Sequence, residues 1–284
     1  MAKSVREVTR VIRPQPTLEG AGVRLQRTIG SPALDYLDPF LLLDEFKSDL
    51  PADYLAGFPE HPHRGIETVT YLLDGRVAHR DSIGNAGLIK PGDAQWMTAG
   101  RGILHSEMPQ GVDNRLWGYQ LWVNLPAKEK MTAPRYQEFA AAGIPEVSAE
   151  SGARVRVLTG RFGDTVGPVR DVAADPTFLD VTVPPGVLFT YETNPDYTAF
   201  AHIVVGDGVF GDQARPPAPI SHMVVLGPGE VVHARSDRDT LRFLLVVGRP
   251  FHEPVARWGP FVMNTREQIQ QTLAELRAGT FIRD

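Results

Sequence analysis

Two stretches of the chain are the most informative about its fold and its candidate functional residues. Residues His61–Gly75 read HPHRGIETVTYLLDG, and residues Pro91–Pro109 read PGDAQWMTAGRGILHSEMP. The run from Glu67 to Leu73 is rich in β-branched and aromatic residues with the period of two that β-strands show. Glycine turns follow it, and short strands separated by such turns are typical of β-sandwiches and barrels. These stretches therefore predict β-structure that carries closely spaced histidines.

The same pattern extends over the whole chain. There are 27 glycines and 24 prolines among 284 residues, more than the roughly 12% that these two residue types contribute on average. Between them lie further strand-like runs, so we expect an all-β protein. These runs are Gly22–Ile29, Tyr119–Leu125, Arg154–Gly160, Phe178–Val183, Ala199–Val205 and Thr240–Val247.

One segment near the C-terminus has a helical pattern. Thr265, with Gln268 three residues later, forms the pattern of a capping box. Apolar residues then recur at i, i+4 and i+7 over residues 269–276, and Gly279 is a suitable residue for the helix end. The sequence therefore predicts a short C-terminal helix.

The two halves of the chain resemble each other weakly. Val69–Gly75 is followed by IKPGDAQWM, and Ala201–Gly208 is followed by VVLGPGEVVHA. A strand, a glycine turn, a second strand and a Pro-Gly-acid pattern thus occur twice, which predicts two related barrels. Small residues without periodicity lie between them, which is typical of a linker. We predict an N-terminal barrel over residues 1–139, a linker over residues 140–153, and a C-terminal barrel with the helix over residues 154–284.

Composition excludes several classes of protein. The net charge is −5, whereas a protein that mainly binds nucleic-acid phosphates is normally basic. The chain has no cysteine, which excludes disulfides, thiolate metal sites and thiol nucleophiles. Its longest apolar runs are about six residues, far short of the roughly 20 that span a bilayer. We expect a cytoplasmic protein that binds neither nucleic acid nor membrane.

The first 30 residues are basic, with a net charge of +4 against −9 for the remainder. A solvated strand face and a docking strip for an acidic protein partner both fit this asymmetry.

The histidines suggest a metal site. His61 and His63 are two positions apart, so on a strand they share one face, and Glu67 has the same parity. His105 and Glu107 repeat this spacing with a carboxylate. Two facing strands would present three imidazoles and one carboxylate, a set that suits a divalent metal such as Fe, Mn, Co, Ni, Cu or Zn. Either Glu67 or Glu107 could supply the carboxylate.

The spacing of these motifs resembles that of the cupin superfamily, and their residues resemble those of the pirin family. The resemblance rests on the two stretches quoted above together with DPFLLLDEF (Asp38–Phe46), LWVNLP (Leu121–Pro126) and GPFVMNT (Gly259–Thr265). It implies two tandem jelly-roll cupin barrels, of which the N-terminal one holds non-haem iron. It also implies His61, His63, His105 and Glu107 as the ligands, and it leaves Glu67 as a residue that supports the site.

The resemblance implies two functions. The first is a quercetin 2,3-dioxygenase-type oxidoreductase, which uses Fe(II) and O₂ to cleave a flavonol, with Glu107 or a neighbouring carboxylate as the base. The second is an iron-dependent redox-sensing interaction module, a transcriptional or metabolic co-regulator with a protein partner. We expect a monomer, because two barrels in one chain can cover each other's edges.

The remaining polar and aromatic residues of interest have structural interpretations. His79 is expected at an exposed strand end, and the alternative is a position at the mouth of the N-terminal barrel. Asp44 and Glu45 are expected in a loop near the barrel, with Arg64 as a partner for a carboxylate there. Isolated histidines in the C-terminal half are expected at the surface or as hydrogen-bonded core residues: His202, His222, His233 and His252. Core packing is expected for the aromatic series, one or two of which could wall an aromatic-substrate pocket: Trp96, Trp117, Tyr119 and Trp122.

Overall fold

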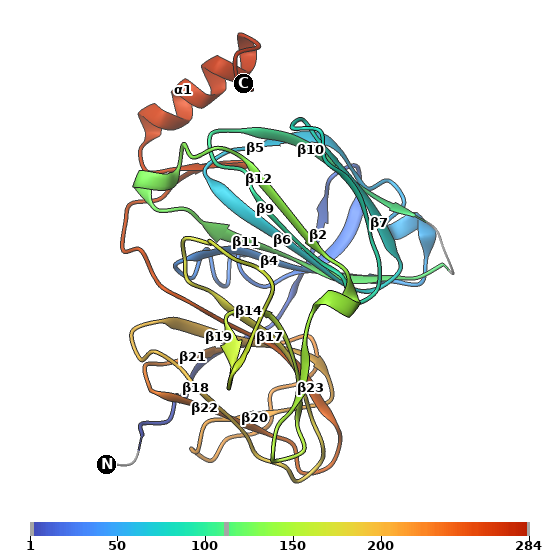
Figure 1. The fold of residues 1–284 in the computed structure, drawn as a ribbon, viewed down its shortest axis with the longest axis vertical. Coiled ribbons are helices and arrows are strands. Elements are labelled where there is room, and N and C mark those ends of the chain that lie inside the picture. The colour runs from blue at the N-terminus through green and yellow to red at the C-terminus, as the bar shows by residue number, and fades with distance from the viewer. Residues whose placement is uncertain (1–2, 111–113, 283–284) are drawn as a thin grey trace. The chain divides into compact units, whose positions relative to one another are not determined.

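The structure, a computed structural model, describes residues 3–110 and 114–282. The chain forms two compact units, each assembled from several segments. The first unit comprises residues 1–15, 31–39 and 142–250, and the second comprises residues 16–30, 40–141 and 251–284. Antiparallel sheets build each unit (Figure 1), so the predicted all-β fold is confirmed.

The first unit contains a seven-stranded sheet in the order β1-β21-β19-β23-β17-β14-β13 and a three-stranded sheet β18-β22-β20. Aromatic rings fill its interior: Phe243 meets Phe189 and Phe210 edge to face, with centroids 5.6 and 5.2 Å away. Its strands are β1 (Val8–Ile12), β13 (Glu146–Ser148), β14 (Arg154–Thr159), β15 (Arg161–Phe162), β16 (Thr165–Val166), β17 (Thr177–Val183), β18 (Phe189–Glu192), β19 (Thr198–Val205), β20 (Val209–Phe210), β21 (Met223–Leu226), β22 (Val231–Arg235) and β23 (Leu241–Gly248).

The second unit contains a seven-stranded sheet in the order β12-β9-β6-β11-β4-β3-β2 and a four-stranded sheet β5-β10-β7-β8. Single turns of 3₁₀ helix lie at Pro51–Asp53 and Ala127–Glu129, and another lies at Ala141–Gly143, where the chain passes between units. The strands of this unit are β2 (Gln15–Glu19), β3 (Val23–Arg27), β4 (Phe40–Ser48), β5 (Phe58–His63), β6 (Ile66–Asp74), β7 (Arg76–Asp81), β8 (Ala86–Ile89), β9 (Ala94–Thr98), β10 (Ile103–Gln110), β11 (Leu116–Asn124), β12 (Arg135–Phe139), β24 (Ala256–Trp258) and β25 (Phe261–Met263).

The predicted C-terminal helix is confirmed as α1 (Arg266–Arg277), which belongs to the second unit. The Thr265 side chain accepts a hydrogen bond from the backbone of Gln268, and the Gln268 side chain accepts one from the backbone of Thr265. This capping box satisfies backbone N–H groups that have no partner within the helix. No helix among the described residues combines the length and the apolar character that crossing a membrane requires.

The structure divides the chain differently from the predicted boundaries. Residues 1–15 join the unit formed by the C-terminal half, because β1 pairs with β21. Residues 251–284 join the unit formed by the N-terminal half, where Phe261 makes a parallel bridge with Arg64. Pairings between such distant segments leave no mark on local composition, so a left-to-right division of the sequence misses them.

The predicted linker over residues 140–153 is also wrong in part. Its central residues form β13, the edge strand that pairs with β14. Ile144 and Ala153 are buried, and Ala149 packs against the core of the first unit. A three-residue strand is too short to show periodicity, so the sequence pattern suggested a linker.

The basic N-terminal segment is neither wholly a solvated face nor wholly a docking strip. Arg6 is buried, and its guanidinium donates hydrogen bonds to the carbonyl oxygens of Gly227, Asn194 and Tyr197. Arg27 is also largely buried and pairs with Asp44. Arg6 and Arg27 therefore form hydrogen bonds and an ion pair within their own units.

Candidate metal centre

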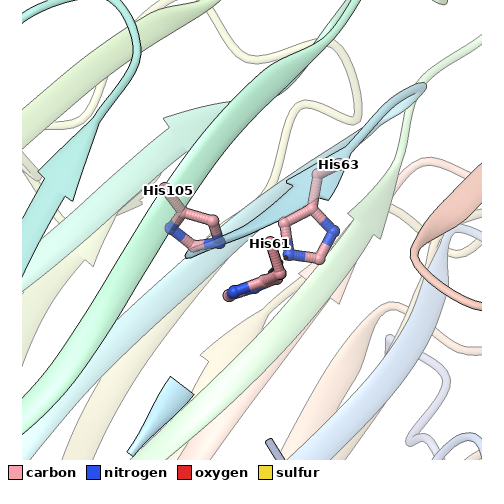
Figure 2. A group of neighbouring side chains, drawn as sticks. All are labelled: His61, His63 and His105. Atoms are coloured by element: carbon pink, nitrogen blue, oxygen red, sulfur yellow. Dashed lines mark hydrogen bonds between the residues drawn. The ribbon is translucent and has the colours of Figure 1, made fainter. Parts of the chain in front are cut away.

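Three of the predicted ligands come together inside the second unit. His61 and His63 lie on β5, His105 lies on β10, and His105 stands directly opposite His61 in the antiparallel pair. One ring nitrogen from each histidine lies within 4.8 Å of the others. Figure 2 shows the three rings directed toward one another.

A tight turn after His63 sets the direction of β5. Gly65 has φ +78°, a conformation that favours glycine, and a Cβ there would lie 2.0 Å from the carbonyl oxygen of Val262. The buried Lys130 ammonium bonds the carbonyl oxygens of both Gly65 and Val262. β5 ends at this turn, and the chain continues as β6 in the seven-stranded sheet.

Hydrogen bonds to the backbone orient two of the rings. Nδ1–H of His61 donates to the carbonyl oxygen of Pro59 at 2.9 Å, and Nδ1–H of His63 donates to that of Pro260 at 3.3 Å. Because a carbonyl can only accept, the proton of the neutral ring lies on Nδ1, and Nε2 carries the lone pair that can bind a metal. These two Nε2 atoms face each other at 3.1 Å. Lone pairs at this separation repel, and a shared cation would remove the repulsion.

The chemistry of His105 is consistent with the same cation. Its two ring nitrogens are buried and have no hydrogen-bond partner. Burial, followed by the neighbouring histidines, lowers the pKa of His105 well below its ordinary value. Burial and then His61 lower the pKa of His63 to about 3. Both rings are therefore neutral, which is the form that binds metal.

The donor set thus fits a divalent transition metal. Nitrogens bound at about 2.1 Å to one ion lie roughly 3 Å apart when they are adjacent ligands, and the two Nε2 atoms already have this spacing. Imidazole ligands suit Fe, Ni, Cu and Zn. His61, His63 and His105 would hold the ion.

Glu107 lies beside the three histidines, outside the group of ring nitrogens that lie within 4.8 Å of one another. It is buried on the same face of β10 as His105. Its Oε1 accepts a hydrogen bond from Thr70 at 2.8 Å, and its Oε2 accepts one from Gln120 at 3.3 Å. Both donors come from the facing sheet, on β6 and β11, so neutral groups hold the carboxylate from across the barrel.

Glu67 does not join the site. It lies on the face of β6 opposite to Thr70, because 67 and 70 differ in parity along a regular strand. Its Oε1 accepts a hydrogen bond from Thr98 at 2.7 Å, and burial raises its pKa to about 7. The parity shared with His63 was misleading, because the Gly65 turn separates the two strands.

His79 was expected at an exposed strand end, but the structure buries it inside the unit. Gln95 donates to its Nδ1 at 3.0 Å, which leaves the proton on Nε2, 3.3 Å from Asp81. Its ring centroid lies 5.4 Å from that of His105. On β7 it stands directly opposite Glu107. His79 therefore adjoins the candidate centre, and the alternation of β7 was the signal that would have revealed it.

The expectation for Asp44, Glu45 and Arg64 was wrong. Both carboxylates are buried on β4 instead of lying in a loop. Asp44 accepts two hydrogen bonds from Arg27, each at 2.7 Å. Arg64 pairs with Glu275 of α1 at 2.8 Å. β4 is buried on both faces, so its acidic residues need partners from other segments. Local sequence does not show those partners, and the two acidic residues therefore suggested a loop.

The aromatic residues divide as expected. Trp96 and Tyr119 are buried in the core, and Trp117 donates through Nε1 to Glu45 at 3.0 Å. Trp122 has a different role: its ring meets His63 edge to face, with centroids 5.0 Å apart, and lines a cavity.

This cavity, of about 480 Å³, opens beside the histidines. Apolar side chains form most of its wall, which is typical of small-molecule sites. The polar lining residues that sequence reasoning missed are Glu19, Arg27, Glu60, Thr70, Gln120 and Arg257. Apolar lining residues include Leu25, Leu42, Phe46, Phe58, Val77, Leu116 and Trp122.

The remaining histidines lie outside the site. Among the described residues, His61, His63 and His105 form the one group of at least three metal-ligating side chains. His233 instead bonds Asp212 through Nδ1 at 2.7 Å. The other isolated histidines of the first unit are His202 and His222, and His252 belongs to the second unit.

Two antiparallel β units, one of which holds a histidine cluster open to a cavity, define a protein of the cupin class. The chain matches the pirin family over residues 22–123 and the pirin C-terminal cupin domain over residues 178–282. It is 45% identical to a pirin-like protein of Caulobacter vibrioides, over 98% of this chain and 99% of that protein. It is 43% identical to human pirin, over 96% of this chain and 93% of that protein. The chain belongs to the pirin family.

A solved structure adds a further similarity. The chain resembles a quercetin 2,3-dioxygenase from Acinetobacter baumannii with a TM-score of 0.87 and 31% sequence identity, over 98% of this chain and 99% of that one. The expected fold of two cupin barrels is thereby confirmed.

Proposed function

We propose that this protein is a metal-dependent dioxygenase that cleaves a flavonol such as quercetin with O₂. The proposed cofactor is Fe(II), held by His61, His63, His105 and Glu107. The observation that carries this proposal is the convergence of three imidazoles at the edge of a largely apolar cavity. Similarity to a quercetin 2,3-dioxygenase supports the choice of reaction.

The residues of the site divide the work. A bound divalent metal would supply Lewis acidity toward the flavonol 3-hydroxyl and would couple the substrate to O₂. Glu107 accepts the hydroxyl proton, and Thr70 and Gln120 hold its carboxylate in place. Trp122 offers an aromatic wall for a flat substrate. The apolar lining keeps bulk water away from the reacting atoms.

Oxygen uptake tests the proposal. Protein reconstituted with Fe(II) should consume O₂ in proportion to added quercetin. His105→Ala should abolish this uptake together with stoichiometric iron binding, because it removes one of three converging nitrogens. His233→Ala is the matched control, since His233 lies in the other unit. It should retain both iron and uptake.

Glu107→Gln tests the proposed roles of Glu107 as ligand and base. The amide keeps the size of the side chain but is a poor base, so turnover should fall at least about a hundredfold. A Glu107→Gln protein with full iron content and full turnover would show that the assignment of Glu107 is wrong.

The second candidate function is an iron-dependent redox-sensing interaction module. The filled interior of the first unit favours it, because Phe189, Phe210 and Phe243 leave that barrel to present surface instead of a binding site. Stoichiometric iron without O₂ uptake, together with a protein partner whose affinity changes with iron oxidation, would support this function. The monomeric state and the cytoplasmic location stay predictions.

A further inference from the structure

The cavity beside the histidines carries charged groups in a definite arrangement. Four carboxylates line it, and two guanidinium groups accompany them. Glu107 belongs to the candidate metal centre, and Glu60 is exposed. Glu19 and Asp44 both pair with Arg27, and of these two Asp44 is the buried one.

Both guanidinium groups of the lining already have partners. Arg27 donates through Nε and one terminal nitrogen to Asp44, and through the other to Glu19, each at 2.7 Å. Arg257 donates to the carbonyl oxygen of Leu41 at 3.2 Å and lies over the Trp122 ring at 5.1 Å. Away from the histidines, the charged lining is therefore poorly suited to bind a carboxylate, a sulfate or a phosphate.

The side chain of Asp44 lines the cavity. It alternates along β4 with Leu42 and Phe46, which line the same space. Packing an ion pair among such residues often stabilises a protein no more than apolar residues would, so stability alone does not account for it. A carboxylate oxygen can accept a second hydrogen bond while it keeps its bond to Arg27.

The sheet places Asp44 at a useful distance from the candidate centre. Asp44 stands directly opposite Gln120, which in turn stands opposite Thr70, the partner of Glu107. Two strand spacings separate Asp44 from Thr70, or roughly 10 Å. A molecule of two to three aromatic rings spans this distance.

We infer that the cavity selects uncharged aromatic ligands rich in hydroxyl groups, and that Asp44 accepts a hydrogen bond from a hydroxyl on the ring remote from the histidines. This inference rests on the proposed function, because it places the ligand in the cavity of the candidate centre. Asp44 is thus a specificity-determining residue, and a phenolic hydroxyl is the donor that matches its carboxylate.

Ligand binding to zinc-loaded protein tests the inference without turnover. The three ligands are quercetin, the flavonol that lacks hydroxyls on its pendant ring, and a quercetin sulfate with the ester on that ring. Quercetin should bind at least about tenfold more tightly than either of the others, since a hydrogen bond to a buried charged acceptor has roughly this value.

Asp44→Asn should weaken quercetin binding about tenfold and change binding of the flavonol without pendant hydroxyls less than about threefold. Glu60→Gln, at an exposed position of the same lining, is the matched control and should leave the preference between the two intact. Circular dichroism and zinc content verify the fold of each variant. If Asp44→Asn does not fold, the three ligands on the unmodified protein still test the selectivity.

Equal losses for both flavonols in Asp44→Asn would show that Asp44 is structural and would overturn the inference. Tight binding of the sulfate would overturn it as well. Oxygen uptake with iron-loaded protein is a separate measurement. A preference for hydroxylated ligands without uptake would therefore support this inference while removing the proposed dioxygenase activity.

Discussion

Glu67 and Glu107 are both buried carboxylates of the second unit, yet their surroundings differ. Two neutral donors from the facing sheet hold Glu107 beside the histidines. Glu67 accepts a hydrogen bond from Thr98 and interacts with the Trp96 side chain, and burial dominates its pKa. One carboxylate is therefore suited to chemistry, and the other is a buried group that favours its protonated form.

The pKa of Glu67 predicts a pH-dependent stability. Burial raises this pKa from 4.5 to about 7, so between these values the folded protein binds a proton that the unfolded chain releases. The free energy of unfolding should therefore fall as pH rises through this window, by up to about 3 kcal/mol. Glu67→Gln should remove this part of the pH dependence, as measured by urea unfolding of metal-free protein from pH 4.5 to 7.5. An unchanged slope in the variant would contradict the prediction.

Thr70 should control the metal affinity through Glu107. Its hydroxyl donates to Oε1 of Glu107, the proposed fourth ligand, and loss of a hydrogen bond to a ligating group typically costs 10- to 100-fold in affinity. Thr70→Val should therefore weaken binding of Co²⁺ at least about tenfold, and Thr70→Ser should restore it. Thr98→Val removes an equally buried hydroxyl from Glu67 and is the matched control. Equal affinities in all three variants would show that Thr70 does not position Glu107.

At the scale of elements, the turn between β5 and β6 decides where the histidines point. Gly65 allows the turn because of its positive φ and because the carbonyl of Val262 leaves no room for a Cβ. Because β5 and β6 lie in different sheets on either side of this turn, odd-numbered residues on β5 and on β6 do not share a face. That is why His63 faces the cavity while Glu67 does not.

Gly65→Ala should destabilise the protein by at least about 2 kcal/mol, since a strained φ and a clash with backbone act together. Gly84→Ala is a matched control, because Gly84 also has a positive φ, +93°, but open space around its position. Thermal unfolding and zinc content should show the larger loss for Gly65→Ala. Equal effects of the two substitutions would mean that contact with Val262 is unimportant.

At the scale of the molecule, segments distant in sequence complete the site. The carbonyl of Pro260 holds His63, and α1 supplies Glu275 to the buried Arg64. A chain truncated after Pro250 keeps all three histidines but loses these contacts, so it should no longer bind stoichiometric zinc. A chain that lacks residues 1–12 loses β1 from the other unit and should retain zinc. Equal zinc contents of the two truncated chains would contradict this division of the fold.

The all-β class, the capped C-terminal helix and the three converging histidines could all be predicted from local sequence patterns. These features have local signals: alternation along strands, a capping box, and ligands two positions apart on one strand face. The surroundings of Glu67, the burial of His79 and the partners of Asp44 and Arg64 depend on contacts between distant segments. The division into units was likewise beyond local patterns. In each case the deciding contact joins residues far apart in sequence, and the burial of a polar side chain depends on that contact.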